Sequence, residues 1–311
     1  MQSPDETDAS SASRDRPELY RRERLIPAPL PQAPLDDRQR LACLRLIRSE
    51  NIGPATFRDL VNHFGGAHAA LEALPGLNAK AGRPHARICP ASRAESELEA
   101  AARVGAQALF TIEPGYPPAL AAVEPPPPLL YVQGQRDLLR RPMVAIVGSR
   151  NGSAAGQKLA GMLAADLGRA GFVVVSGLAR GIDAAAHAAA LSTGTIAVIA
   201  GGIGNVYPPE NVDLQARIAA EGVVVSENPP GFVPRAQDFP RRNRLISGMS
   251  LGIVIVEAAR RSGSLITARF AREQSREVFA VPGHPLDPRA EGTNGLIKQG
   301  EVTVVDRKSV V

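Results

Sequence analysis

The stretch FPRRNRLISG, which begins at Phe239, places three arginines within four positions behind an aromatic residue and a proline. The longer segment from Arg235 to Arg276 holds nine arginines against three acidic residues, a local balance of +6, compared with +5 for the whole protein. Arginine makes forked hydrogen bonds with phosphate oxygens, and an aromatic ring can stack on a nucleobase. This pattern predicts binding to a phosphate-rich polymer. It also poses a problem, because a helix that begins here would have cations at its positive end.

Glycines and hydroxyl groups follow the apolar runs from residue 143 onwards, as in GSRNGS, SGLARGID, AGGIG and RRSGSLITA. Glycine allows a backbone amide to approach an anion closely, and the N-terminus of a following helix attracts negative charge. We therefore predict that these loops contact phosphate. The residues assigned to this role are Gly148, Ser149, Arg150, Ser176, Gly177, Arg180, Gly201, Gly202, Ser264 and Thr267.

The common nucleotide-binding motifs do not match. GSRNGSAAG differs from the dinucleotide motif GxGxxG because its first two glycines, Gly148 and Gly152, are four positions apart. The apolar run at 172–177 does not end in the acidic residue that would hold a ribose. The P-loop motif GxxxxGK[ST] does not occur in the sequence. We therefore predict no cofactor, and a basic groove with an aromatic residue favours single-stranded nucleic acid instead.

Several residues could do catalytic chemistry, but their context argues against it. Asp183 and His187 have the i, i+4 spacing of metal ligands, yet a third ligand with suitable spacing is missing. Ser176 could complete a triad with them, but the GxSxG nucleophile elbow is absent. Glu257 could act as an acid or base, although pairing with a neighbouring arginine is favoured. His284 stands alone. We predict neither a metal ion nor a catalytic residue.

Apolar runs alternate with helical segments in the second half of the sequence. Continuous Val/Ile runs that alternate with helices indicate a parallel sheet covered on both faces. The fold class predicted is α/β, with a doubly wound, mostly parallel Rossmann-like sheet, whose ligand crevice lies beyond the carboxyl ends of the strands. Strands are expected at 143–148, 172–177, 195–202, 223–228, 252–258 and 277–283. Helices are expected at 154–170, 182–193, 210–220, 243–250 and 265–276.

The sequence before the sheet divides into three parts. Residues 1–35 are polar and proline-dotted, and are expected to form a disordered leader. Residues 36–104 predict a small helical domain, in which ENIGPATFRDL gives a helix, a turn and a helix, as in sterile-alpha-motif or helix-hairpin-helix units. Such hairpins can present amides to a phosphate, but this one carries few basic residues, which favours a packing role. The Rossmann-like domain is placed at 105–311, and the four prolines at 125–128 indicate that it begins with an extended segment.

The remaining composition indicates a cytoplasmic protein. Cys43 and Cys89 are the two cysteines of the sequence, and they do not form a CxxC or Cys/His metal motif. The first residues lack the apolar core of a signal peptide, and no later apolar run is long enough to span a bilayer. We therefore expect reduced thiols and no membrane partner.

Seven stretches of the sequence occur in the order and spacing of one known family. They are VAIVGSR, VVSGLARGID, GGIGNVYPPEN, SENPPG, FPRRNRLISGMS, VIVEAARRSGSLITARFAREQSREVFAVPG and EGTNGLIKQG. Over residues 109–300 the chain thereby resembles the DNA-processing protein A (DprA/Smf) family, and residues 36–104 look like the small N-terminal domain of that family. The resemblance implies a homodimer that binds single-stranded DNA, protects incoming DNA in natural transformation and loads the RecA recombinase, without catalysis.

The resemblance also assigns roles to individual residues. The family's DNA-binding arginine in its GSR motif falls on Arg150, and Arg180 and Arg235 are weaker additions. Arg242 is left unmatched and is expected to face solvent. The aromatic and basic residues of the family's FPxRNR motif (Phe-Pro-any-Arg-Asn-Arg) are assigned to Phe239, Arg241, Asn243 and Arg244.

The sequence departs from the family pattern in places, and other functions stay open. Ile203 replaces a glycine of the usual run and is expected to narrow that loop. Many members continue into a winged-helix domain, which a sequence ending in VVDRKSVV is expected to lack. One alternative function is a Rossmann-like nucleotide phosphoribohydrolase, although AGGIGNVYPPEN lacks the threonine of that motif and changes its spacing to Glu210. The other is a small-nucleotide-binding protein that uses the same phosphate loops.

Overall fold

The computed structural model describes residues 34–300 and 302–305 of the chain. The leader predicted for residues 1–35 lies outside the described residues except for its last two positions, and residues 306–311 lie outside them as well. Among the described residues, no helix is both long and apolar enough to cross a membrane.

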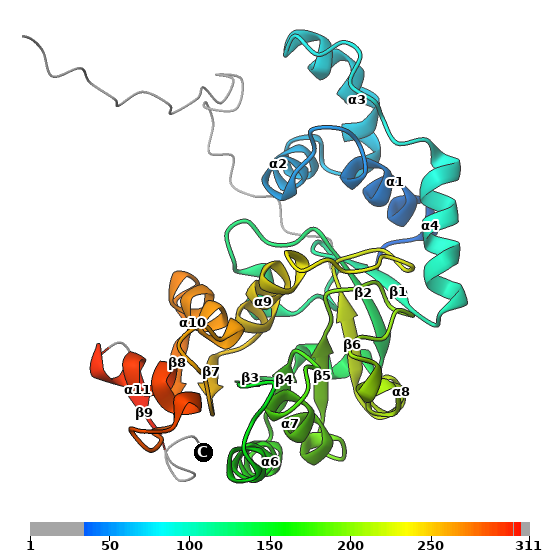
Figure 1. Ribbon diagram of the computed structural model, residues 1–311. Coiled ribbons are helices and arrows are strands. Elements are labelled where there is room, and N and C mark those ends of the chain that lie inside the picture. The colour runs from blue at the N-terminus through cyan, green and yellow to red at the C-terminus, as the bar shows by residue number, and fades with distance from the viewer. Residues whose placement is uncertain (1–33, 301, 306–311) are drawn as a thin grey trace, which may run out of the picture.

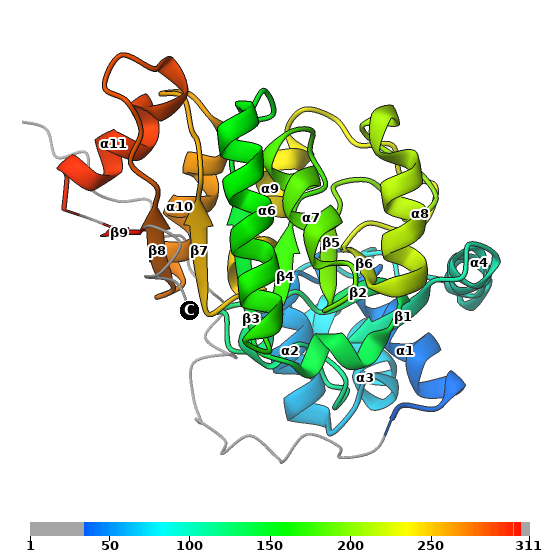
Figure 2. The same cartoon turned by 90° about the horizontal axis from the view of Figure 1, so that it is seen from below.

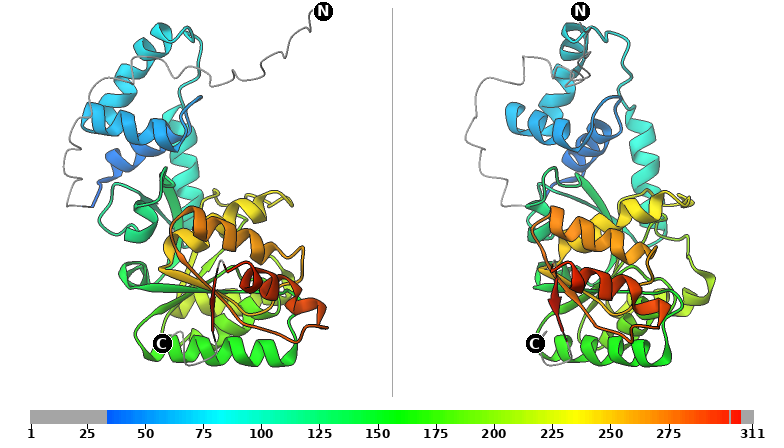
Figure 3. Two further views of the ribbon diagram at one scale, coloured as in Figure 1. Left: turned by 90° about the vertical axis from the view of Figure 1, so that its left-hand side faces the viewer. Right: turned by 60° about the vertical axis from the view of Figure 1, so that its left-hand side comes forward.

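The N-terminal part of the described chain is helical (Figures 1 and 3). It consists of α1 (Asp37–Ile47), α2 (Pro54–Phe64), α3 (Ala67–Lys80) and α4 (Ala91–Arg103). The first helix begins where the Asp36 side chain accepts a hydrogen bond from the Gln39 amide and the Gln39 side chain accepts one from the Asp36 amide. The second ends at Gly65, whose φ of 75° is a left-handed conformation that suits glycine. Leu44 and Phe57 are fully buried in the core of this part. The predicted small helical domain is confirmed.

The rest of the described fold is built on a single nine-stranded sheet. Its strands lie side by side in the order β1-β2-β6-β5-β4-β3-β7-β8-β9. In the spatial order from β6 through β5, β4, β3, β7 and β8 to β9, each strand is parallel to its neighbour. In contrast, β1 is antiparallel to β2, and β2 is antiparallel to β6. Each predicted strand run contains one of β3 to β8, so the predicted fold class is correct. The strands are β1 (Gln107–Phe110), β2 (Leu129–Gly134), β3 (Met143–Val147), β4 (Val173–Ser176), β5 (Thr195–Val198), β6 (Val223–Ser226), β7 (Gly252–Ile255), β8 (Glu277–Ala280) and β9 (Thr303–Val304).

Helices cover both faces of this sheet (Figure 2). One face carries α6 (Ala154–Arg169), α7 (Ile182–Ala190) and α8 (Val212–Glu221). The opposite face carries α9 (Asp238–Met249) and α10 (Gly263–Glu273), and the short α5 (Pro118–Ala121) packs against α9. Neighbouring residues of β3 contribute to different core clusters on the two faces, Val144 with α6 and α7 and Ala145 with α9 and α10. This double cover explains why the central strands are mostly apolar.

Partly buried ion pairs and their hydrogen bonds connect the helical part to the sheet. The Arg40 guanidinium on α1 pairs with Glu113 and donates a hydrogen bond of 2.7 Å to the Ala108 carbonyl of β1. Arg48, which follows α1, pairs with Glu97 on α4 at 2.7 Å, and Glu97 also accepts the hydroxyl of Tyr131 from β2. The predicted extended segment of the proline-rich region thus provides β1 and β2, antiparallel strands on which the helical part rests.

The winding of the sheet changes direction at β3. The chain runs from β3 outward through β4, β5 and β6, and then returns to place β7 on the other side of β3. Ligands of doubly wound sheets bind where the strand order reverses, at the carboxyl ends of the strands. We therefore expect the site in the loops that follow β3 and β7.

Candidate functional site

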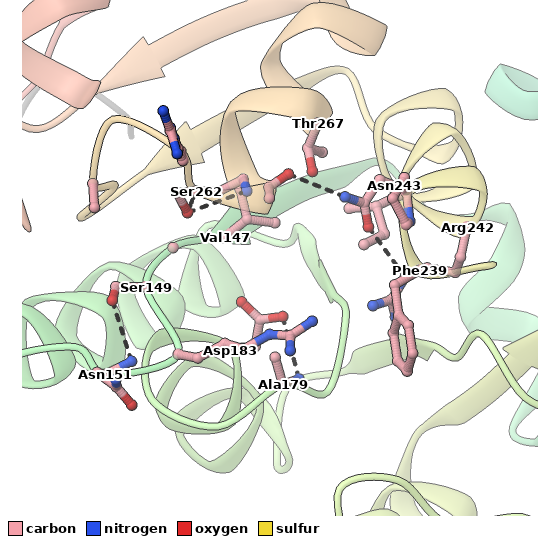
Figure 4. Close-up of a pocket in the computed structure, with 18 of the residues that line it drawn as sticks. Val147, Ser149, Asn151, Ala179, Asp183, Phe239, Arg242, Asn243, Ser262 and Thr267 are labelled. Atoms are coloured by element: carbon pink, nitrogen blue, oxygen red, sulfur yellow. Dashed lines mark hydrogen bonds between the residues drawn. The ribbon is translucent and has the colours of Figure 1, made fainter. Parts of the chain in front are cut away.

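A pocket of about 780 Å³ lies at this reversal point (Figure 4). It is lined by the loops after β3, β4 and β7, by the first turns of α9 and by the N-terminus of α10. These elements are far apart in sequence, and the sheet brings their loops to one edge. The predicted site residues that line it are Gly148, Ser149, Arg150, Phe239, Asn243, Ser264 and Thr267.

The glycines after β3 serve packing between loops. A Cβ on Gly148 would lie 2.7 Å from the Ile182 side chain, and one on Gly152 would lie 2.8 Å from the same side chain. Gly181 has a φ of 74°, and a Cβ there would lie 2.5 Å from the Ser149 carbonyl oxygen. The glycines therefore let the loops after β3 and β4 approach each other, which fixes the position of Arg150 at the pocket mouth.

The N-terminus of α6 is already occupied by a carboxylate. Glu257, which follows β7, accepts a hydrogen bond of 2.9 Å from the Ser153 amide and another from the Ser153 hydroxyl. A Cβ on Gly156 would lie 2.5 Å from a Glu257 oxygen, so the carboxylate sits against the first turn of the helix. This corrects the expected pairing of Glu257 with an arginine. In a dinucleotide-binding fold the helix after the first strand receives the pyrophosphate, and here Glu257 would repel it.

The N-terminus of α10 offers a better place for a phosphate. The Ser262 hydroxyl caps this helix, accepting from the Ser264 amide, and Arg260 and Arg261 directly precede it. Arg261 is exposed at the pocket and forms no ion pair within the described part of the chain. Thr267 is only 1% exposed, and its hydroxyl points into the pocket (Figure 4). The N-terminus of α10, its hydroxyl groups and the Arg261 guanidinium thus border the same pocket.

Helix α9 begins five positions earlier than the sequence predicted. Asp238 is its first residue, and its carboxylate accepts a hydrogen bond of 2.8 Å from the Arg235 amide. Pro240 occupies the first turn, where the missing amide hydrogen costs nothing. An acidic residue therefore stands at the positive end of the helix, and the arginines lie further along it. The conflict with the helix dipole disappears.

Arg242 is buried, which overturns the expectation that it faces solvent. It is 8% exposed, and its guanidinium donates hydrogen bonds to the carbonyls of Gly177 (2.7 Å) and Val198, at the ends of β4 and β5. Burial lowers the pKa of Arg242 to about 10, and the nearby charge of Asp183 opposes this shift. Counted from Phe239, the family pattern Phe-Pro-any-Arg-Asn-Arg also puts its first arginine at Arg242. The assignment of that position to Arg241 was wrong by one residue.

The other predicted arginines divide into paired and unpaired ones. Arg244 forms a two-oxygen ion pair with Glu227, and Arg180 lies 3.4 Å from Glu210. Arg241 lines a separate pocket of about 200 Å³, together with Arg48 of the helical domain. The exposed arginines that form no ion pair within the described residues include Arg150, Arg235, Arg241 and Arg261.

Phe239 lies at the mouth of the pocket between a cation and a second aromatic ring. The Arg150 guanidinium is 5.6 Å from the centroid of its ring, within the range of a cation–π contact. The Tyr207 ring lies 5.2 Å away at 53°. The sequence prediction missed Tyr207, although an aromatic residue within a glycine-rich loop after a strand is a visible signal.

Some predicted residues do not reach the pocket. Ser176 is buried, and its hydroxyl donates to the Ile146 carbonyl. Gly201 and Gly202 are buried against the loop 229–234, and the Gly202 amide already donates to the Phe232 carbonyl at 2.9 Å. Ile203 is buried as well, within the core that includes the helical domain.

The groups considered for catalysis have structural partners. The Asp183 carboxylate accepts hydrogen bonds from the amides of Gly177 and Ala179. His187 contacts the Thr195 hydroxyl at 2.7 Å, and burial lowers the pKa of His187 to about 3, so the imidazole is neutral. Asp183 and His187 therefore form neither a triad with Ser176 nor a metal pair. Within residues 34–300 and 302–305, no cluster of three or more His, Cys, Asp or Glu side chains could hold a metal ion.

Residues 107–311 match the model of the family described as DNA recombination-mediator protein A, and residues 37–100 match a DprA-like N-terminal HHH domain. The chain belongs to the DNA recombination-mediator protein A family.

Individual relatives of the family agree with this assignment. The chain is 46% identical over 188 residues to the DNA processing protein DprA of Bacillus subtilis. These residues make up 60% of the chain and 63% of the relative. It is 44% identical over 199 residues to the Protein Smf of Escherichia coli, covering 63% of the chain and 53% of the relative. The chain therefore spans less than two thirds of the length of these curated relatives.

Solved structures of two members show the same fold. The X-ray structure of DNA processing protein A from Streptococcus pneumoniae superposes with a TM-score of 0.65 at 35% identity, covering 82% of this chain and 84% of that one. The structure of DNA processing protein A from Helicobacter pylori, which is described in terms of that protein's single-stranded DNA binding mode, superposes with a TM-score of 0.61 at 31% identity. The superposition covers 65% of this chain and 92% of that one.

Proposed function

We propose that this member of the DNA recombination-mediator protein A family binds single-stranded DNA without sequence preference, across the pocket at the reversal point of its sheet. The observation that carries the proposal is the Arg150 guanidinium beside the Phe239 ring, at the mouth of a pocket that also contains the unpaired Arg261. A cation beside an aromatic ring fits a phosphate followed by a base. The single-stranded DNA binding mode described for the Helicobacter pylori relative supports the same function.

Different residues would contact different parts of the DNA strand. Arg150 and Arg261 would each bind a phosphate group of the strand. The backbone amides and hydroxyl groups at the N-terminus of α10 would donate hydrogen bonds to a further phosphate. Phe239 would stack on a base, which tolerates any sequence because every base has an aromatic face. Each neutralised phosphate should contribute about −0.7 to the slope of log affinity against log salt concentration.

Replacing Arg150 with alanine is expected to weaken binding of oligo-dT at least tenfold, or about 1.4 kcal/mol, because the change removes both a phosphate contact and the cation beside Phe239. Fluorescence anisotropy across a salt series measures the effect. The slope of log affinity against log salt concentration should become shallower by about 0.7, the contribution of one phosphate. Arg217→Ala is the control, because Arg217 is exposed on α8 and lines none of these pockets. Equal affinities of the two variants would remove Arg150 from the site.

Replacing Glu210 with glutamine is expected to strengthen binding roughly two- to fivefold at low salt, because it frees Arg180 from an exposed ion pair. The gain should shrink as salt rises. Glu221→Gln is matched in charge, since Glu221 pairs with Arg217 on α8 at 3.8 Å. If the two glutamine variants bind alike, Arg180 does not contact DNA.

We further propose that the protein acts by binding and not by catalysis, since Asp183, His187 and Glu257 are each engaged by structural partners. The same titration with ATP, NAD and cyclic nucleotides tests the small-nucleotide alternative. Incubation with nucleoside monophosphates tests for release of free base. Protection of incoming DNA, loading of RecA, a homodimeric state and a cytoplasmic location are proposals that rest on the family. A pull-down with RecA, with and without DNA, tests the second of these.

A further inference from the structure

A cleft of about 200 Å³ lies between α9 and the helical part of the fold, which is placed above this helix in Figure 1. Helix α9 separates this cleft from the main pocket. Phe239 and Asn243 of α9 line the main pocket. Asp238, Arg241 and Leu245, which share one face of the helix at spacings of three and four, line the cleft. The function proposed above uses the main pocket and leaves the cleft without a role.

The cleft is lined mainly by charged and polar side chains. Three arginines reach it, namely Arg48 from the end of α1, and Arg241 and Arg242 from α9. None of the described residues that line it is aromatic, so it offers no surface on which a base could stack. Phosphate accepts forked hydrogen bonds from guanidinium groups. The chemistry of the cleft therefore suits a phosphate group and not a base.

The two carboxylates that border the cleft already have partners. Both oxygens of Glu227 accept from the Arg244 guanidinium. Asp238 accepts a hydrogen bond of 2.8 Å from the Arg235 amide. Asp238 is also the first residue of α9, where the positive end of the helix stabilises a carboxylate. Because these partners offset their charge, the two acids would repel a bound phosphate less than free carboxylates would.

The arginines of the cleft differ in how their charge is offset. Arg48 pairs with Glu97 at 2.7 Å, and Asp183 lies near the buried Arg242. Arg241, in contrast, is exposed and forms no ion pair within the described residues. An exposed cation without a partner, at the mouth of a polar cleft, attracts an anion from solution.

The segment before α9 connects the cleft with the main pocket. Pro234 and Ala236 line the main pocket and Asp238 lines the cleft, so the chain between them runs from one to the other. This segment carries Arg235, which is exposed and has no ion pair in the part of the chain that the structure describes. An α-helix with its side chains is about 10–12 Å across. A few nucleotides would therefore suffice for a strand to pass around the end of α9.

We propose that the cleft between α9 and the helical part binds phosphate groups of the DNA strand where the strand leaves the main pocket, with Arg241 and Arg48 as its contacts. The proposal rests on single-stranded DNA binding in the main pocket and extends that binding across α9. It gives the helical part a direct role, through Arg48. Long strands would gain contacts that short strands lack.

Arg241→Ala tests the cleft with oligo-dT of about 4 and of about 16 nucleotides, which bracket the usual size of single-stranded DNA sites. The variant should weaken binding of the long oligonucleotide about three- to tenfold. It should weaken binding of the short one by less than about twofold, because a short strand fills the main pocket alone. For the long strand, the slope of log affinity against log salt concentration should become shallower by about 0.7.

Two further variants calibrate this measurement. Arg150→Ala, in the main pocket, should weaken binding of both lengths alike. Arg217→Ala removes the same charge from the exposed face of α8, away from the cleft and the main pocket, and should change neither affinity.

The role of the helical part is tested with the double variant Arg48→Ala/Glu97→Gln, because Arg48→Ala alone would leave the Glu97 carboxylate without its cation. Glu97→Gln is the matched control, since it keeps the Arg48 guanidinium and can still accept the Tyr131 hydroxyl. The double variant should bind the long oligonucleotide about two- to fivefold more weakly than Glu97→Gln, and the short one alike. Thermal unfolding checks that both variants fold.

Inorganic phosphate distinguishes a phosphate of the strand from a free one. Thermal unfolding in phosphate and in chloride of the same ionic strength should give the same difference for the parent protein and for Arg241→Ala. A rise in phosphate for the parent protein alone, without a length dependence in Arg241→Ala, would assign the cleft to free phosphate and overturn the proposal.

The outcomes distinguish the cleft from the function on which it rests. If oligo-dT of neither length binds the parent protein, the proposed function fails. If the parent protein binds and Arg150→Ala weakens binding, while Arg241→Ala acts on both lengths alike or on neither, the main pocket stands and the cleft is wrong. Equal affinity of Arg48→Ala/Glu97→Gln and Glu97→Gln for the long oligonucleotide would overturn the role of the helical part.

Discussion

Replacing Arg242 with methionine should lower the free energy of unfolding by about 3–5 kcal/mol, the usual cost of removing one partner from a buried ionic contact. The change leaves the carbonyls of Gly177 and Val198 without the donor that the structure gives them, and leaves Asp183 buried without a nearby cation. Asp183 is already difficult to keep charged, because burial raises its pKa and Arg242 opposes that rise. Urea denaturation followed by circular dichroism measures the loss, with the slope of the transition checked for two-state behaviour.

The neighbouring arginine provides the matched control. Arg241→Ala removes the same charge from an exposed position on the same helix, and should change the free energy of unfolding by less than about 0.5 kcal/mol. Adding Asp183→Asn to Arg242→Met should recover part of the loss, because the uncompensated charge is then gone. Similar stabilities for Arg241→Ala and Arg242→Met would show that the hydrogen bonds of Arg242 to the carbonyls of Gly177 and Val198 do not stabilise the fold.

Replacing Gly202 with alanine should lower stability by about 1–3 kcal/mol or more, as overpacking does when the backbone must move. A Cβ there would lie 1.9 Å from the Pro229 carbonyl oxygen, which is a backbone atom that cannot rotate away. At Gly201 the nearest atom is the Pro234 Cδ at 3.1 Å, and Gly201→Ala should therefore be much milder. Thermal unfolding of the two variants measures the difference.

The same pair of variants tests the assignment of these glycines to DNA. Both were predicted from sequence to contact phosphate, whereas the structure packs them against the loop 229–234. At a temperature at which both variants are folded, each should bind oligo-dT like the parent protein. A stable Gly202→Ala variant with weakened DNA binding would restore the original assignment.

The sheet was predictable because its physical signal is local. Strands buried on both faces need mostly apolar residues, so β3 to β8 appear in the sequence as short runs rich in Val and Ile. The start of α9 was missed for a local reason too. Pro240 looks like a helix breaker, but in a first turn it is harmless, and Asp238 before it supplies the expected acidic residue.

The roles of the arginines could not be predicted in the same way. Arg241, Arg242 and Arg244 are chemically identical, and their environments depend on residues that are distant in sequence. The partners of Arg242 lie 65 and 44 positions away, at the ends of two different strands. Arg244 faces Glu227, 17 positions earlier. The three-dimensional arrangement of the strands places Arg242 against two strand ends, Arg244 beside Glu227, and Arg241 on the exposed surface, where it is available to a ligand.

The carboxylate of Glu257 at the start of α6 has a consequence for free nucleotides. Folds of this kind often serve metabolism by holding nucleotides from the free pool at that helix. Here the chain supplies its own anion, so the pyrophosphate of a free nucleotide such as ATP or NAD would meet the Glu257 carboxylate at that helix.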